Sequence, residues 1–121
     1  MSDTIDTLMT RNLHEVFGEY DGARRRSAID QLYTEDCIFS DHFGHHVGRA
    51  ALDAAVARLL EKLPGYVIAD RGPAQSLQDS GRVLWRFGPP EEPARITGVD
   101  FVIVRDERIA ALYVFLDAPP A

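Results

Sequence analysis

Apolar residues recur at helical spacing in three segments of the first half of the chain. In the first segment they fall on one face of a helix of about four turns, at Ile5, Leu8, Met9, Leu13, Val16 and Phe17. A second helix is predicted over residues 23–33, and a third over residues 50–63, where Pro64-Gly65 ends it. We expect the third helix to pack against a sheet through Leu52, Val56, Leu59, Leu60 and Leu63.

The second half changes to short apolar runs separated by turn residues, a pattern typical of strands. Strands are predicted over residues 37–41, 66–69, 74–78, 83–87, 96–105 and 109–116. Residues 43–48, with glycine at positions 44 and 48, are predicted to form a loop. Helices followed by a run of strands indicate an α+β fold with an antiparallel sheet. Where helices cover one side of a curved sheet, the cavity at their junction is the default place for a ligand.

Length and charge narrow the possible partners. The 121 residues correspond to a single domain over residues 1–121, and 45% of them are hydrophobic, as in a packed globule. The net charge of −6 argues against nucleic acid or an anionic membrane as partner, because both require a basic surface. The basic cluster at residues 24–26 is interpreted as a solvated helix face.

The single cysteine and the N-terminal residues bear on the cellular compartment in which the protein is expected. Cys37 cannot form an intrachain disulfide, and its apolar neighbours predict a small buried side chain rather than a nucleophile. The N-terminus lacks the charged and then apolar pattern of a leader peptide. No apolar stretch approaches the roughly 18 residues that span a bilayer. We therefore expect a cytoplasmic protein.

Two segments carry a resemblance to a known family. Residues 32–41 (Leu-Tyr-Thr-Glu-Asp-Cys-Ile-Phe-Ser-Asp), followed by Val47-Gly48-Arg49, resemble the first half of a SnoaL-like domain of the nuclear-transport-factor-2-like superfamily. Residues 98–109, with a strand, a charged hairpin and Arg108-Ile109, resemble its second half. The resemblance implies a cone-shaped α+β barrel, in which three N-terminal helices pack on a strongly curved antiparallel sheet and enclose a pocket.

Within the superfamily, the segment from Ser40 to Gly44 is similar to the corresponding segment of ketosteroid isomerase. That resemblance implies that Asp41 is a catalytic base and Asp100 a protonated acid that polarises an oxygen. It also implies that Tyr33 supports the site and that Trp85 forms an aromatic pocket wall. Two further pocket positions depart from the isomerase pattern. Phe17 and Val56 stand where that enzyme has tyrosines. The tyrosine that matches Phe17 donates directly to the oxyanion in the isomerase, and phenylalanine has no donor. Loss of such a donor costs about 10²–10³ in rate at comparable sites. A related proton transfer, or a lyase or hydrolase reaction on another apolar ligand, therefore stays open.

The residues themselves give each carboxylate two interpretations. Asp41 ends a short strand, so it either caps the following turn or lies at a pocket mouth as a base. Asp100 alternates with Val102 and Val104 on one strand face, and a carboxylate there must be neutral, paired or hydrogen-bonded. Its partner would then be Arg82, Arg86 or Arg95, unless the carboxyl group points into the cavity and stays protonated.

Three histidines lie close together at His42, His45 and His46. Adjacent side chains in an extended chain point apart, so we expect no metal site here. His42 is a candidate proton carrier at the pocket mouth.

These patterns favour a small enzyme that moves a proton on an apolar or polycyclic ligand without a cofactor. Asp41, Asp100 and His42 would be catalytic, and Phe17, Tyr33, Val56 and Trp85 would contact the substrate. The alternatives are a binding module for a small hydrophobic ligand on the same fold, and a purely structural dimerisation domain. A homodimer is expected through the outer sheet face, where apolar positions accumulate at Phe101, Ile103, Tyr113 and Phe115.

Overall fold

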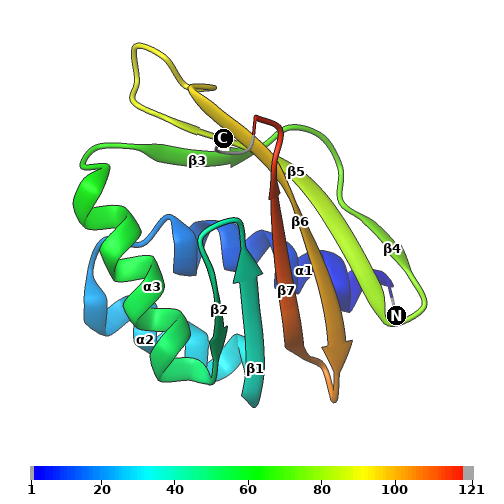
Figure 1. Cartoon of the computed structure of the whole chain (residues 1–121). Coiled ribbons are helices and arrows are strands. Elements are labelled where there is room, and N and C mark those ends of the chain that lie inside the picture. Colours follow the sequence, from blue (N-terminus) through cyan, green and yellow to red (C-terminus); the bar gives the residue numbers. More distant parts are fainter. Residues whose placement is uncertain (1, 119–121) are drawn as a thin grey trace.

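The helices form a layer on one side of the molecule (Figure 1). The computed structural model describes residues 2–118, with side chains from residue 4 onward. Helix α1 (Ser2–Asn12) continues into a π-helical turn, η1 (Leu13–Phe17), followed by α2 (Gly22–Leu32) and α3 (Arg49–Lys62). All six apolar positions of the first predicted helix are buried. None of the helices in the described part of the chain is long and apolar enough to cross a membrane.

A strongly curved sheet covers the other side of the described chain. Its strands are β1 (Tyr33–Asp41), β2 (Gly44–Val47), β3 (Val67–Asp70), β4 (Gln75–Leu77), β5 (Ser80–Gly88), β6 (Ile96–Arg105) and β7 (Arg108–Leu116). The strand order is β2-β1-β7-β6-β5-β3, and β4 also pairs with β5. In Figure 1 the sheet bends so far that β3 runs crosswise to β7. The predicted α+β fold, with helices on a strongly curved sheet, is confirmed, although the sheet does not close into a barrel.

The sheet is mixed, and this corrects the prediction of an antiparallel sheet. Strand β1 runs parallel to β7, with Phe39 opposite Leu112 and Ser40 opposite Tyr113, whereas the other strand pairs are antiparallel. No tight turn links β1 to β7, because α3 and five strands lie between them in the chain. The local sequence therefore does not fix their relative direction.

The predicted loop at residues 43–48 is mostly a strand. Gly44 pairs with Asp41 across a two-residue turn, so β2 forms a hairpin with β1. Strand β1 also begins at Tyr33, earlier than predicted, where it pairs with Ile109. Both differences have the same cause. Pairing with a neighbouring strand supplies backbone hydrogen bonds, and these can hold a short polar segment in a strand although its side chains do not predict one.

The start of α3 is fixed against β1. Gly48 has a φ of 92°, a conformation that favours glycine, and its N–H donates to the carbonyl of Cys37 over 2.7 Å. The guanidinium of Arg49 then donates to the carbonyl of Tyr33, with Nη2 at 2.6 Å. These contacts hold α3 beside the β1–β2 hairpin, so that the helix and the hairpin form two walls of one space.

The apolar face of α3 divides between core and cavity. Leu52, Val56 and Leu60 are buried as predicted, and Leu63 is half-buried against the core. Leu59 departs from the prediction, since 36% of it is exposed and it lines the cavity described below. A cavity therefore lies at this part of the helix face, where the sequence pattern implies packing.

One arginine of the basic cluster is buried, contrary to the solvated-face interpretation. Arg25 is 6% exposed and its Nε donates to Asp53 Oδ1 of α3 over 2.7 Å. Its Nη1 donates to the carbonyl of Glu19. Arg25 therefore joins α2 to α3, while its neighbour Arg24 lies on the surface.

Candidate functional site

A cavity of about 320 Å³ lies between η1, α3, the β1–β2 hairpin and the curved sheet. Its walls are predominantly apolar, as in most small-molecule sites. The charged or ionisable side chains in its lining are Asp41, His46, Arg58, Lys62 and Asp100. The other lining residues are Phe17, Phe39, Phe43, Ala55, Val56, Leu59, Ile68, Trp85, Phe87, Ile96, Val114 and Leu116.

Asp100 lies on β6 and is 4% exposed. No lysine or arginine among the described residues pairs with it, so the ion-pair interpretation is wrong. Arg82 and Arg95 bond elsewhere, to Gln75 and to Glu92 and Tyr66. Burial raises the pKa of Asp100 from its usual 3.8 to about 7, and the side chains of Trp85 and Asn12 partly oppose this. The carboxyl group is therefore substantially protonated near neutral pH and able to donate.

A buried chain of polar groups stands behind Asp100. The Tyr33 hydroxyl donates to Asn12 Oδ1 over 2.6 Å, and Asn12 Nδ2 lies 3.5 Å from Asp100 Oδ2, a long hydrogen bond. Asn12 and Tyr33 are both fully buried. Burial, reinforced by the nearby Asp100, raises the pKa of Tyr33 well above its usual value of 10.0. Tyr33 therefore stays neutral and anchors Asn12, which orients the carboxyl group.

Tyr33 lies behind the cavity, which differs from its predicted place in contact with the pocket. It is absent from the described residues that line the cavity, because its ring is buried in the core and its hydroxyl is occupied by Asn12. Its position supports the site only through Asn12 and Asp100.

Trp85 forms a wall of the cavity on β5, next to Asp100. The indole is 5% exposed, and its Nε1 is buried without a described partner that meets hydrogen-bond geometry. The same N–H still lowers the pKa of Asp100, so the two groups are close in space. Trp85 pairs with Gly98 of β6, where a Cβ atom would lie 2.6 Å from Trp85 Cζ2. Glycine at position 98 therefore makes room for the indole.

Asp41 lies at the end of β1 and lines the same cavity as Asp100. Its Oδ1 accepts hydrogen bonds from the backbone N–H groups of Phe43 and Gly44, at 2.9 and 3.0 Å. The two interpretations of Asp41 are therefore compatible, because one carboxylate oxygen caps the hairpin turn while the residue borders the cavity. The turn holds the carboxylate in a fixed position.

Phe17 and Val56 lie in the lining, on η1 and α3 respectively. The ring of Phe17 packs edge-on against Phe39 of β1, with centroids 5.7 Å apart. Both residues contribute apolar surface and no hydrogen-bond donor.

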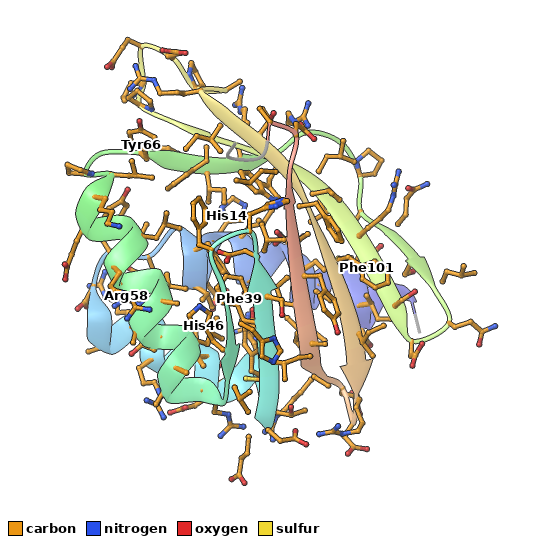
Figure 2. The ribbon with its side chains drawn as sticks, in the orientation of Figure 1. His14, Phe39, His46, Arg58, Tyr66 and Phe101 are labelled. Atoms are coloured by element: carbon orange, nitrogen blue, oxygen red, sulfur yellow. The ribbon has the colours of Figure 1, made fainter. Side chains whose placement is uncertain are left out.

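The three histidines point in different directions. His42 is exposed and outside the described lining, and its Nε2 accepts from the backbone N–H of Leu116 over 3.2 Å, which corrects its predicted place at the pocket mouth. His45 Nδ1 lies 2.6 Å from Ser40 Oγ. His46 lies on the other face of β2, where it lines the cavity and stacks on Phe39 with centroids 5.5 Å apart (Figure 2). No group of three or more His, Cys, Asp or Glu side chains suited to a metal ion occurs among the described residues.

Sequence reasoning missed four polar residues that line the cavity or stand behind Asp100. Asn12 is the polar position within the apolar stripe of α1, between Met9 and Val16, and that interruption is the same kind of signal that singled out Asp100. His46 lies in a segment whose sequence predicts a loop, and in a loop the alternation of His45 and His46 does not indicate which side chain faces inward. Arg58 and Lys62 follow Ala55 at positions i+3 and i+7, but charges on a surface helix carry no special signal without the cavity beside them.

Comparison with known proteins bears on the family. The sequence model of the SnoaL-like domain matches residues 10–112. Comparison with curated proteins gives no match. A SnoaL-like family protein from Agrobacterium tumefaciens, for which isomerase activity has been proposed, is 26% identical, with a TM-score of 0.88 over 96% of this chain and 99% of its own.

Two more distant structures share the fold. A protein from Kribbella flavida proposed to be a ketosteroid isomerase is 18% identical, with a TM-score of 0.71 over 99% of this chain and 85% of its own. A Jannaschia protein proposed to be a SnoaL-like polyketide cyclase is 17% identical, with a TM-score of 0.78 over 96% of this chain and 87% of its own. With the domain match over residues 10–112, the resemblance seen in sequence is confirmed, and this chain belongs to the SnoaL-like family.

Proposed function

We propose that this protein is an enzyme that transfers a proton within an apolar carbonyl compound, using side chains alone. The observation that carries the proposal is that two carboxyl groups, Asp41 and Asp100, border one apolar cavity. Their surroundings differ: Asp100 is buried beside Trp85 with a pKa of about 7, whereas Asp41 is held by backbone N–H groups at a turn. A pair of acids in unlike environments is the arrangement that acid–base catalysis requires.

In this mechanism Asp41, as a carboxylate, takes a proton from the carbon next to the ligand carbonyl. Negative charge then develops on the carbonyl oxygen, and the protonated Asp100 stabilises it by donating a hydrogen bond. Return of the proton from Asp41 to another carbon completes an isomerisation. The apolar walls formed by Phe17, Phe39 and Val56 exclude water and accept a hydrophobic ligand body.

The second candidate is a binding module for a small apolar ligand. Phe17 favours it, because a phenylalanine in the lining leaves the carbonyl oxygen with one donor fewer than the isomerase pattern provides. The isomerase and cyclase activities proposed for structural neighbours favour chemistry on a polycyclic or carbonyl substrate in this fold, without identifying one.

The test is exchange of ketone α-protons in deuterium oxide, followed by NMR over a panel of apolar ketones. We expect exchange above the buffer rate for at least one ketone, a loss of about 10²-fold or more in Asp41→Asn, and a comparable loss in Asp100→Ala. Phe17→Tyr restores a donor and should raise the rate. Arg86→Gln, an exposed position outside the described lining, is the control. Binding without exchange in any variant would leave the binding module as the function.

A further inference from the structure

The mouth of the cavity carries two cations that the proposed mechanism does not use. Arg58 and Lys62 are four residues apart on α3, and both line the cavity while remaining exposed (Figure 2 labels Arg58). They follow Ala55 and Leu59 on the cavity side of the helix, and Val56, also in the lining, is buried. The helix therefore presents apolar surface to the interior and positive charge at the rim.

Neither cation is neutralised by the protein in the described part of the chain. The ion pairs there involve Arg11, Arg24, Arg25, Arg26, Arg71, Arg95 and Arg105. Asp41 borders the same cavity, but none of these ion pairs joins it to Arg58 or Lys62. Acidic residues outnumber basic ones by 19 to 13, so two adjacent unpaired cations at a cavity mouth run against the overall charge.

Two like charges at positions i and i+4 of a helix repel each other. Lys62 lies in the last turn of α3, where the helix dipole stabilises a positive charge. Arg58 lies one turn earlier, where this stabilisation does not explain its charge. An anion bound between the two side chains would relieve the repulsion. A guanidinium group offers parallel N–H donors that match a carboxylate, and the ammonium group adds a second charge.

We propose that the ligand of this cavity is an apolar carboxylic acid, whose ionised carboxylate lies between Arg58 and Lys62 while its apolar body fills the interior towards Asp100 and Trp85. The inference rests on the proposed function in taking the cavity as the ligand site, but it does not require catalysis. It narrows the substrate class from any apolar carbonyl compound to one that also bears an acid group.

The test compares phenylbutyrate with its uncharged amide, phenylbutyramide, as probes of the intact protein. Trp85 is the only tryptophan of the chain and lies in the cavity wall, so its fluorescence reports occupancy directly. We expect the acid to bind more tightly than the amide by about fivefold, a value reduced from that of a buried pair because both cations are exposed. Arg58→Gln combined with Lys62→Gln should abolish this preference, so that the acid binds no more tightly than the amide.

The matched control combines Arg86→Gln with Arg108→Gln, two exposed arginines outside the described lining, which lowers the net charge by the same amount. It should keep the preference for the acid. Equal binding of acid and amide to the wild-type protein, or an equal loss of preference in the control, would overturn the inference. If the inference were overturned but the amide still bound, the proposed function would be unaffected, since that proposal needs only an apolar ligand in the cavity. If neither probe bound, both proposals would lose their support.

Discussion

At the scale of single residues, the unusual feature is an acid placed in the core without a counter-charge. Asp100 keeps one long hydrogen bond to Asn12, which is held in turn by Tyr33. Burying an ionised carboxylate without a paired cation is costly, and the group responds by retaining its proton. When the pH rises and the carboxyl group ionises, the folded state is therefore destabilised.

The first prediction follows from that cost. The pKa of Asp100 is higher in the folded protein, at about 7, than its ordinary value of 3.8, so the folded state binds more protons between these values. Stability should therefore fall as the pH rises from about 4 to about 7, and the loss should be complete above the folded pKa. This difference in pKa corresponds to a loss of about 4 kcal/mol of unfolding free energy, at about 1.4 kcal/mol for each pKa unit. Asp100→Asn should remove the decline and be the more stable protein at pH 8 or so, as measured by urea unfolding across pH. A parallel pH dependence in the two proteins would contradict it.

The second prediction concerns the glycine beside Trp85. A Cβ atom at position 98 would lie 2.5 Å from the carbonyl oxygen of Phe115 and 2.6 Å from the indole ring. Because backbone and a packed ring must both move, Gly98→Ala should cost about 1–3 kcal/mol of unfolding free energy and shift the tryptophan emission. Gly22→Ala is the matched control, since its nearest neighbour would be the end of Arg25 at 3.5 Å. Unchanged emission and stability in Gly98→Ala would show that the indole is not held as described.

At the scale of elements, the position of α3 decides whether a cavity exists. The helix is fixed at its start by Gly48 and Arg49 and on its side by the ion pair of Arg25 with Asp53. The Arg25 side chain is 7% exposed and that of Asp53 is 24% exposed. Such a pair contributes specificity more than stability while it is intact, but removing one partner leaves the other poorly solvated.

The third prediction tests this link. Arg25→Ala should destabilise the protein by about 2–3 kcal/mol, at the low end for a buried pair because Asp53 is partly exposed. Arg24→Ala, one residue away, should change stability by no more than about 0.5 kcal/mol, because that side chain is 77% exposed. Thermal unfolding of the two variants side by side is the measurement. Similar losses in both would mean that α2 and α3 are held together by other contacts.

At the scale of the whole molecule, the curved sheet has an apolar outer face opposite the helices. Phe101, Ile103 and Tyr113 are half-buried on it, Phe115 is 52% exposed, and the rings of Phe101 and Tyr113 lie 6.3 Å apart. Contiguous apolar surface of this kind is typical of an interface.

The fourth prediction is that two copies associate through this face. Sedimentation at micromolar concentration should give a dimer, the commonest closed assembly. Tyr113→Glu combined with Phe115→Glu should give a monomer with an intact fold. Ala54→Glu, which adds a charge at an exposed position of α3 on the helical side of the molecule, is the control and should stay dimeric. A wild-type protein that sediments only as a monomer would remove the proposed interface.

Much of this molecule can be predicted from local sequence. The apolar stripe from Ile5 to Phe17, the face of α3 and the long strand over residues 96–105 all have the spacing of their elements, because the periods of helix and strand determine which residues share a face. Asp100 was identified for the same reason, since a charge among the valines of one strand face must be buried or paired. Cys37 was likewise predicted to be buried, and it is.

Tertiary structure alone decided the contacts between segments far apart in the chain. The parallel pairing of β1 with β7, the buried pairing of Arg25 with Asp53, and the withdrawal of Tyr33 from the cavity to Asn12 all join residues with no sequence relation. The sequence alone determined which residues must avoid water, because that preference belongs to each side chain and its spacing. Only the packed fold determined which buried polar groups form hydrogen bonds with one another. The packed fold also placed Asp41, Asp100, Arg58 and Lys62 around one cavity. Both results depend on distances between segments far apart in the chain, which no local sequence pattern encodes.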